Sequence, residues 1–353
     1  MASSKKIAVV LFNLGGPDSP EAVKPFLFNL FNDKAIISLP QPIRFLLAKV
    51  ISARRAPITQ KIYEEIGGKS PLLEKTKEQA RALEKHLTNV GNVKTFIAMR
   101  YWHPFSKKTA RQVQSFSPDK VILVPLYPQF STTTTGSSIK DWQRAAKKAG
   151  LKAKTSSVCC YPTEAAFIRS HANLVKSCLL RAVKSGPTQI LFTAHGLPKK
   201  IVDGGDPYPG QVGETVNAVV DALKKDPDLK GVLFDHTLCY QSRVGPLEWI
   251  GPTTENEIKK AGSEKLNLVV VPISFVSEHS ETLVELDIEN KKLARAAGVK
   301  NYYRVPALGT NEDFIKGLGN VVKAALDRDG VSAFEGTRFC PAEYSKCPCQ
   351  LNK

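Results

Sequence analysis

Short apolar runs alternate with longer segments of helical periodicity along the whole chain. The runs typical of strands lie at 7–14, 93–99 and 121–126 in the first half, and at 189–193, 231–234, 266–273 and 302–305 in the second. Strands that alternate with helices in this way are typical of parallel sheets covered by helices on both faces. The pattern therefore predicts an α/β protein made of two similar doubly wound, Rossmann-like domains with parallel sheets.

The boundary between the two halves is expected near CCYP at 159–162, because a long helical pattern from 163 toward 184 opens the second half. We predict an N-terminal domain at 1–160, a C-terminal domain at 161–325 and a cysteine-bearing extension at 326–353. With 353 residues and 42% hydrophobic composition, each domain can bury a core of its own. Ligands of open α/β sheets bind beyond the carboxyl ends of the strands, so we expect an active-site cleft between the domains.

The chain is strongly basic, with 50 Lys and Arg against 33 Asp and Glu and a formal charge of +17. Such a charge favours nucleic acid, anionic lipid or an acid-bearing small molecule as partner. The basic residues are scattered, and no helix-turn-helix, zinc-finger or RNP signature is present, which argues against nucleic acid. A short polar N-terminus and the lack of about eighteen uninterrupted apolar residues predict a soluble, cytoplasmic protein that can associate with a membrane.

A histidine follows one of the predicted buried strands, in the segment TAHGLP at 193–198. His195 leaves the strand and enters a tight turn that contains glycine and proline, so its imidazole is expected to face the binding site. The alternative is a structural role in which the ring only bonds to nearby backbone.

Acidic residues follow another predicted strand. A helix that begins near Ser277 would place Glu281, Glu285 and Glu289 on one face, with His279 close by. Like charges at this spacing oppose each other, and the plain alternative is a solvated acidic face eased by the helix N-terminus. Because no lysine accompanies the stripe, we favour the interpretation that these groups carry protons or metal ions.

Motifs in the same order along most of the chain resemble those of ferrochelatases. They are NLGGPDS at 13–19, RRAP at 54–57, IGGKSPL at 66–72, MRYWHP at 99–104, LYPQFSTTTTGSS at 126–138, TAHGLP at 193–198, CYQSRVGPLEWIGP at 239–252 and SEHSETLVELDIE at 277–289. The resemblance implies a lyase that inserts Fe(II) as substrate into protoporphyrin IX to form protohaem, the terminal step of haem biosynthesis.

Carried over by position, the resemblance assigns roles to individual residues. His195 and Glu281 would be catalytic and would meet the substrate iron, while His279, Glu285 and Glu289 would form a proton or metal path. A flat aromatic ligand needs apolar walls and a few cations for its propionates. The candidate porphyrin contacts are Leu14, Arg55, Arg100, Tyr101, Ser138, Trp249 and Phe275.

The segment 39–56 resembles the hydrophobic lip of the family. Its apolar residues are followed by Arg54 and Arg55 and comprise Ile43, Phe45, Leu46, Leu47, Val50 and Ile51. A greasy rim with basic flanks is suited to rest on an anionic membrane and collect a poorly soluble porphyrin. A buried amphipathic helix is the alternative.

Seven cysteines in a chain of this class are expected to be thiols or metal ligands rather than disulfides. Some ferrochelatases carry a [2Fe-2S] cluster on one internal and three C-terminal cysteines, and the spacing of Cys340, Cys347 and Cys349 resembles the bacterial version. The resemblance implies Cys159 or Cys160 as the fourth of the four thiolates that usually hold such a cluster. A zinc site is the alternative, since ligand type alone does not separate the two metals.

The sequence is also compatible with other functions. Insertion of iron into coproporphyrin III is the nearest, and the NLGGP form of the first loop favours protoporphyrin IX. Cobalt chelation of a more acidic tetrapyrrole ranks lower. A non-catalytic porphyrin or haem carrier would need the apolar walls but not the acidic stripe. The sequence leaves the choice between monomer and homodimer open.

Overall fold

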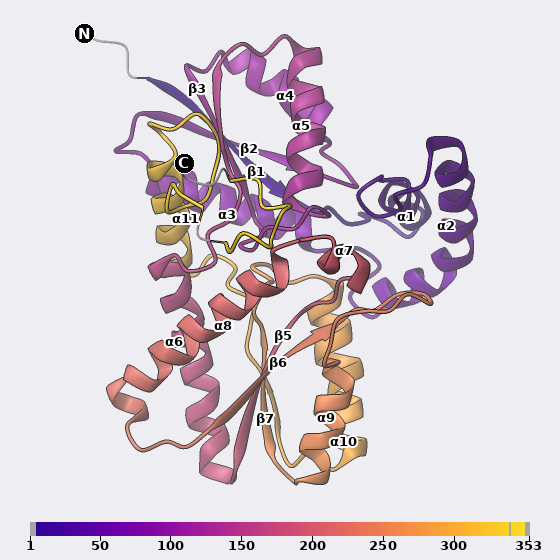
Figure 1. Ribbon diagram of the computed structural model, residues 1–353, viewed down its shortest axis with the longest axis vertical. Coiled ribbons are helices and arrows are strands. Elements are labelled where there is room, and N and C mark those ends of the chain that lie inside the picture. The colour runs from indigo at the N-terminus through magenta and orange to yellow at the C-terminus, as the bar shows by residue number, and fades with distance from the viewer. Residues whose placement is uncertain (1–4, 339, 350–353) are drawn as a thin grey trace. The chain divides into compact units, whose positions relative to one another are not determined.

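The fold contains two sheets of parallel strands (Figure 1). The computed structural model describes residues 5–338 and 340–349. These residues form two compact units. Unit 1 contains 5–161, 318–338 and 348–349, and unit 2 contains 162–317 and 340–347.

The sheet of unit 1 has the strand order β2-β1-β3-β4-β9, and every neighbouring pair is parallel. Its strands are β1 (Lys6–Asn13), β2 (Asn92–Met99), β3 (Lys120–Pro125), β4 (Lys154–Val158) and β9 (Gly330–Ser332). Its helices are α1 (Val23–Phe31), α2 (Gln41–Glu64), α3 (Leu72–His86), α4 (Ser106–Phe116) and α5 (Thr135–Ala149). A further helix, α11 (Glu312–Ala324), begins in unit 2 and ends in unit 1.

The core of unit 1 forms on both faces of β1, which is buried along nearly its whole length. A strand that is apolar on both faces belongs inside a sheet covered twice by helices. On one face, Val10 and Phe12 pack with Val113 of α4 and with Ile139 and Trp142 of α5. Helices α4 and α5 therefore cover the face of the sheet that bears Val10 and Phe12.

The sheet of unit 2 has the order β6-β5-β7-β8, again with every neighbouring pair parallel. Its strands are β5 (Thr188–His195), β6 (Asp235–Gln241), β7 (Asn267–Pro272) and β8 (Tyr302–Arg304). Its helices are α6 (Ala165–Ala182), α7 (Lys199–Asp203), α8 (Tyr208–Lys225), α9 (Thr254–Ser263) and α10 (Lys291–Ala297), with short 3-10 turns η1 (Val183–Ser185) and η2 (Pro227–Leu229) and the π-helix η3 (Glu281–Asn290).

Close packing of α9 against α10 covers one face of this second sheet. Ile258 and Ala261 of α9 and Ala294 of α10 lie against Leu191 and Val270 of the strands. At Gly262, a Cβ atom would lie 2.2 Å from the carbonyl oxygen of Ala297, so only glycine allows this approach.

The fold class expected from the sequence is confirmed, and six of the seven expected strands are present within a residue or two. The prediction of a strand at 231–234 is wrong. Gly231 has φ +80°, Val232 closes a turn onto Leu229, and Leu233 is 89% exposed, so the strand begins only at Asp235. β4 and β9 were missed because KTSSV lacks an apolar run and β9 is only three residues long.

The predicted ranges and the observed units differ at the C-terminal end. Residues 318–325, predicted to belong to the second domain, lie in unit 1, and the predicted extension is divided between the units. The reason is that α11 continues without a break across position 317, and β9 then pairs with β4.

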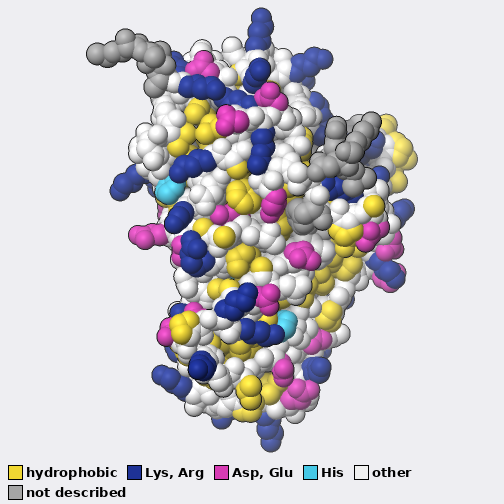
Figure 2. All heavy atoms as spheres, turned by 60° about the vertical axis from the view of Figure 1, so that its left-hand side comes forward, with side chains coloured by type: hydrophobic (Ala, Val, Ile, Leu, Met, Phe, Trp, Pro, Cys, Tyr) yellow, Lys and Arg dark blue, Asp and Glu magenta, His cyan; other side chains and the backbone are white. Residues whose placement is uncertain are grey.

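Two surface properties bear on partners. The described part of the chain contains no helix long and apolar enough to span a membrane. Figure 2 shows Lys and Arg side chains spread singly over the face it presents, rather than gathered in one patch.

His171, in the middle of α6, is buried against the ring of Phe167, with a distance of 4.9 Å between ring centroids. Neither ring nitrogen has a hydrogen-bond partner among the described residues. Burial lowers the pKa of His171 from 6.5 to about 3, because a charged imidazole would lose its hydration there.

This buried histidine predicts a pH-dependent loss of stability. Between pH 6.5 and 3 the unfolded chain binds a proton that the folded chain excludes, so stability falls as the pH falls, by about 1.4 kcal/mol per pH unit. His171→Met should therefore lose about 2 kcal/mol less than the parent between pH 7 and 5, as measured by urea unfolding. His103→Met, at an exposed position, is the control. Equal pH dependence in His171→Met and the parent would contradict the prediction.

Candidate active site

His195 is the last residue of β5, and the turn that follows orients its ring. Its Nδ1 lies 2.6 Å from the carbonyl oxygen of Gly196. Because a carbonyl only accepts hydrogen bonds, Nδ1 carries the proton of the neutral ring and the lone pair is on Nε2. The backbone bond that defined the structural alternative is therefore present, but it occupies one nitrogen and leaves the other free for chemistry.

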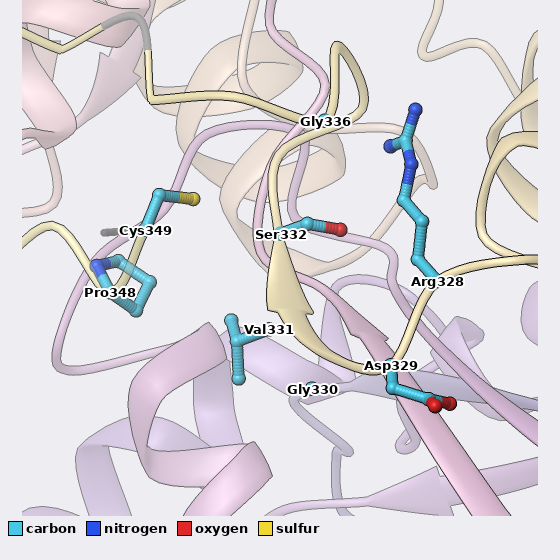
Figure 3. A pocket seen from close by; sticks show the side chains of 8 residues that line it. All are labelled: Arg328, Asp329, Gly330, Val331, Ser332, Gly336, Pro348 and Cys349. Atoms are coloured by element: carbon cyan, nitrogen blue, oxygen red, sulfur yellow. The ribbon is translucent and has the colours of Figure 1, made fainter. Parts of the chain in front are cut away.

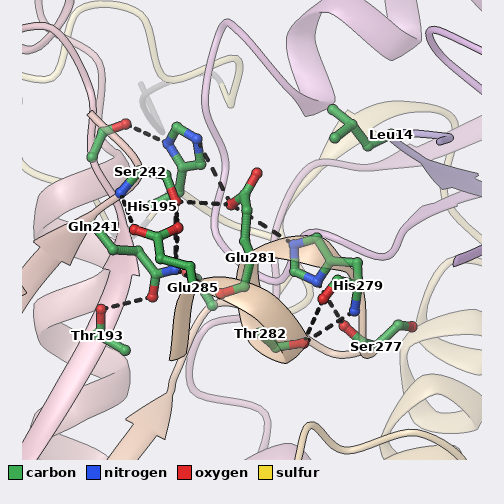
Figure 4. A network of polar contacts seen from close by, with 12 residues as sticks. Leu14, Thr193, His195, Gln241, Ser242, Ser277, His279, Glu281, Thr282 and Glu285 are labelled. Atoms are coloured by element: carbon green, nitrogen blue, oxygen red, sulfur yellow. Dashed lines mark hydrogen bonds and ion pairs between the residues drawn. The ribbon is translucent and has the colours of Figure 1, made fainter. Parts of the chain in front are cut away.

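His279 repeats this arrangement from a different part of unit 2. Its Nδ1 lies 3.1 Å from the carbonyl oxygen of Ser277, which again leaves the lone pair on Nε2. The two Nε2 atoms lie on either side of one carboxylate oxygen, Oε2 of Glu281, at 3.8 Å from His195 and 3.7 Å from His279 (Figure 4). The structure thus brings three of the predicted residues into one cluster.

Glu285 lies beside Glu281 and is held by the end of β6. It accepts hydrogen bonds from the backbone N–H of Ser242 at 2.8 Å, from the Ser242 hydroxyl, and from Nε2 of Gln241 at 3.1 Å. Gln241 also donates to the carbonyl oxygen of Glu281 and accepts from Thr193. A fixed polar network therefore joins β5, β6 and the acidic residues (Figure 4).

The two carboxyl groups have opposite pKa shifts. Burial alone would raise the pKa of Glu281. The positive charge of His195 in its protonated form, the hydrogen bond and charge of protonated His279 and a hydrogen bond from Ser242 outweigh burial and lower the pKa to about 2. Burial, together with the negative charge of Glu281, raises the pKa of Glu285 to about 7. Near neutral pH the pair therefore holds one firmly ionised carboxylate and one group ready to gain or lose a proton.

The helix that carries these acids differs from the expected one. It begins at Ser280 rather than near Ser277, and 281–290 is a π-helix rather than an α-helix. Residues 277–279 instead form a turn in which the hydroxyl of Thr282 accepts the N–H of His279 at 3.0 Å. Glu289 is exposed, so of the expected stripe only Glu281 and Glu285 belong to the polar network.

Two aromatic rings border this cluster in unit 2. The ring of Trp249 lies 6.5 Å from that of His195, and the ring of Phe275 lies 4.8 Å from that of His279, centroid to centroid. Both aromatic residues are partly exposed. The predicted wall residues of unit 2 thus flank the histidines.

In unit 1, Leu14, Arg100 and Tyr101 meet beyond the carboxyl ends of β1 and β2. The N–H of Tyr101 donates to the carbonyl oxygen of Leu14 at 2.9 Å. The next residue, Gly15, has φ +84°, and a Cβ there would lie 2.9 Å from the backbone nitrogen of Trp102. Glycine therefore permits the turn that aligns these predicted residues.

Arg100 and Tyr101 both donate hydrogen bonds to Asp33, a residue that was not predicted to belong to the site. Arg100 donates to Asp33 and to Ser137 at 2.8 and 2.6 Å, and the Tyr101 hydroxyl donates to Asp33 at 2.8 Å. Burial opposes ionisation of Asp33, yet Arg100 and these hydroxyls lower its pKa. The charge of Arg100 is therefore neutralised within unit 1.

The remaining two predicted contacts of unit 1 lie apart from this network. Ser138 is buried near the start of α5. Arg55 is half-buried on α2, and no ion pair of Arg55 is found within 5–338 and 340–349.

The cysteines of the predicted cluster are all buried and form no disulfide. At the end of β4, Cys159 Sγ lies 3.2 Å from Cys160 Sγ and 3.3 Å from Cys349 Sγ. Figure 3 shows Cys349 and Pro348 beside β9, where they line a pocket together with residues of that strand. In unit 2, Cys340 Sγ accepts a hydrogen bond from Gln211 at 3.2 Å.

Within the described residues, no group of three or more His, Cys, Asp or Glu side chains has an arrangement that would hold a metal ion.

Sequence reasoning missed Gln241, Ser242 and Asp33. The first two stand inside the CYQSRVGPLEWIGP motif, which was noted without roles for its polar residues. Ser242 also has φ +62°, a strained conformation that no sequence signal announces. Asp33 follows α1 in an ordinary polar context.

Solved structures place the fold in a class of chelatases. SirB from Bacillus subtilis with Fe3+ superimposes with a TM-score of 0.56 at 11% identity, covering 92% of this chain and 96% of that one. The sirohydrochlorin chelatase SirB from Bacillus subtilis subspecies spizizenii in complex with cobalt gives a TM-score of 0.52 at 11% identity, with coverages of 91% and 95%. At this identity the likeness concerns the fold: the α/β fold of chelatases.

The amino-acid sequence is much more similar to known proteins than the fold alone indicates. The family model Ferrochelatase matches residues 6–326. Ferrochelatases of Phenylobacterium zucineum and Caulobacter vibrioides are 51% and 50% identical, each match covering 98% of both chains, and that of Rickettsia bellii is 50% identical over 98% of this chain and 96% of its own. The chain belongs to the ferrochelatase family. It is a metal-chelating lyase that inserts ferrous iron into a porphyrin and so forms haem.

Proposed function

We propose that His195 and Glu281 carry out the insertion and that the porphyrin is protoporphyrin IX. The observation that supports these roles best is the position of Glu281 Oε2, which lies 3.8 Å from Nε2 of His195 and 3.7 Å from Nε2 of His279. Metal insertion needs a base for the pyrrole protons and oxygen or nitrogen donors for the incoming cation. This cluster supplies both.

The number of protons released in the reaction determines what the residues of the cluster must do. The porphyrin gives up two N–H protons when Fe(II) binds its four nitrogens, and iron does not change its oxidation state. Nε2 of His195 accepts the two pyrrole protons one after the other and passes the first toward Glu285 before it takes the second. The ionised Glu281 stabilises the imidazolium that forms each time. With a pKa near 2, Glu281 is a poor base but a permanent anion, suited to attract the cation.

Glu285 is the member of the cluster suited to pass protons on. Its pKa of about 7 lets it gain and lose a proton near neutral pH, and Gln241 and Ser242 keep it fixed. In this proposal His279 supports Glu281, and the exposed Glu289 marks the outer end of the path.

The porphyrin contacts follow from the chemistry of the ligand. Trp249 and Phe275 offer aromatic faces next to the two histidines. Leu14 and Tyr101 are proposed as further wall residues, and Arg55, Arg100 and Ser138 as polar contacts. Since Arg100 is paired with Asp33, Arg55 is the better candidate for a propionate.

Insertion of iron into coproporphyrin III and passive porphyrin binding are the two alternative functions. The NLGGP loop favours protoporphyrin IX over coproporphyrin III, which has four carboxylates instead of two. A passive porphyrin carrier would have no use for a carboxylate held between two basic nitrogens.

The parent protein should insert Fe(II) into protoporphyrin IX faster than into coproporphyrin III under anaerobic conditions. His195→Ala and Glu281→Gln should each lower kcat with both porphyrins by at least about a hundredfold, since each removes a group from the proton-transfer site. Absorption spectra of porphyrin and haem follow the reaction.

His236→Ala, at an exposed histidine of the same unit, is the matched control. Near-normal rates in both active-site variants would rule out the assigned roles, and a preference for coproporphyrin III would change the substrate.

We further propose a [2Fe-2S] cluster on Cys340, Cys347, Cys349 and one internal cysteine. The fit rests on buried thiols without disulfides and on the 3.3 Å approach of Cys159 to Cys349, which favours Cys159 over Cys160. Thiolates of this kind would hold a cluster or zinc.

Protein purified without oxygen should absorb in the visible region. Cys349→Ser and Cys159→Ser should remove this absorption together with bound iron, whereas Cys160→Ser should keep it. Cys178→Ser, a buried thiol of α6, is the control. A colourless protein that contains zinc would contradict the cluster.

We also propose that the lip rests on anionic membrane as a peripheral contact. Helix α2 supports this because its buried face consists of small and polar residues, whereas large apolar side chains are exposed. Exposed fractions are 55% for Ile43, 63% for Leu46 and 48% for Val50. Buried Arg44 ties the start of the helix to the carbonyl oxygens of Asn32 and Leu39.

Leu46→Glu should weaken binding to vesicles of phosphatidylcholine and phosphatidylserine about tenfold or more, because burial of a leucine contributes about 1.5–3 kcal/mol. Leu233→Glu removes an exposed leucine outside the lip and should have no effect. Co-sedimentation measures both. Equal binding by Leu46→Glu and the parent would exclude the lip as the contact.

A further inference from the structure

The edge strand β8 holds the π-helix through two side chains. The hydroxyl of Tyr302 donates to the carbonyl oxygen of Leu286 at 2.8 Å. Two residues on, Arg304 binds both oxygens of Asp287, with Nε at 2.8 Å and Nη2 at 2.5 Å. A bidentate pair of this kind fixes orientation as well as distance.

The same guanidinium also reaches the turn that precedes the π-helix. Its Nη1 donates to Glu278 Oε1 at 2.5 Å, and this oxygen accepts the N–H of Ala307 at 2.9 Å as well. The Arg304 side chain is 13% exposed, and those of Glu278 and Asp287 are 21% and 34% exposed. Solvent therefore screens the contact with Glu278 only weakly.

His279, Glu281 and Glu285 all lie between the two anchored positions, 278 and 287. A π-helix has a rare hydrogen-bond pattern and persists only where its surroundings hold it. Removing the guanidinium would leave two carboxylates without their cation, a few residues from Glu281. The chain between the anchors would then relax.

We propose that Arg304 is a positioning residue for iron insertion: by binding Glu278 and Asp287 at once, it sets the spacing of the π-helix that holds Glu281 between His195 and His279. This inference rests on the proposed roles of His195 and Glu281. Arg304 acts through these residues rather than on the substrate.

Arg304→Met keeps length and packing but removes the charge. We expect kcat to fall about tenfold to a hundredfold, the usual cost of losing a partner that orients such a site, with the KM for porphyrin within about twofold. Arg304→Lys should recover only part of kcat, because an ammonium cannot bind Asp287 bidentately and reach Glu278 at the same time. Arg169→Met, which breaks an exposed ion pair with Asp313, is the matched control and should keep the parent kcat.

A double-mutant cycle separates positioning from general loss of structure. Asp287→Asn should lower kcat by itself, and adding it to Arg304→Met should cost little more, since both remove the same contact. If Arg304→Met does not fold, the positioning role is tested with Asp287→Asn and Glu278→Gln instead. A lowered kcat with an unchanged KM in these two variants would support the proposal.

Normal kcat in Arg304→Met, or fully additive losses in the cycle, would overturn the proposal. Glu281→Gln, assayed in the same series, separates the proposed catalytic role of Glu281 from the positioning role of Arg304. If Glu281→Gln is active, the proposed roles fail. If it is inactive while Arg304→Met and Asp287→Asn are normal, the positioning role alone fails.

Discussion

The candidate site depends on the contact between the carboxylate of Glu281 and the imidazoles of His195 and His279. Hydrogen bonds to the backbone fix the tautomers of both imidazoles. His195 and His279 each donate a hydrogen bond from Nδ1 to a backbone carbonyl oxygen, and Nε2 of each ring lies toward Glu281. The backbone thus decides which nitrogen is basic. Since Glu281 is kept ionised, the cluster combines a permanent negative charge with two nitrogens that can accept a proton or approach a cation.

Holding this arrangement requires support from every strand of the second sheet. β5 supplies His195, and β6 supplies Gln241, which Ser242 follows directly. The loop after β7 supplies His279, and β8 supplies Arg304. The π-helix is the meeting point of these contacts. Its irregular geometry is stabilised by partners outside the helix, which is why the polar network extends so far from the two histidines.

The sequence predicted what depends on composition and order, and missed what depends on three-dimensional contact. Apolar runs located β1, β5 and β7 because both faces of these strands are buried, whereas polar β4 gave no such signal. His195, Glu281 and Glu285 stood out as chemically unusual. The turn at Ser277, the π-helix and the exposure of Glu289 could not be foreseen, because contacts with β6 and β8 decide them. Asp33 was overlooked for the same reason: its partners Arg100 and Ser137 lie far along the chain.

The looseness of the cluster is consistent with the reaction of the family. An enzyme that passes a cation to a macrocycle gains nothing from binding that cation tightly beforehand, since such affinity would be lost when the metal leaves. Within the described residues, Glu281 and the two histidines 3.7 and 3.8 Å from it do not form a group arranged to hold a metal ion. The pKa values agree with the proposed roles: an ionised Glu281 would attract iron, and Glu285, near pKa 7, can release a proton again. In this proposal the four macrocycle nitrogens would outcompete these few donors, so that transfer would proceed toward the porphyrin.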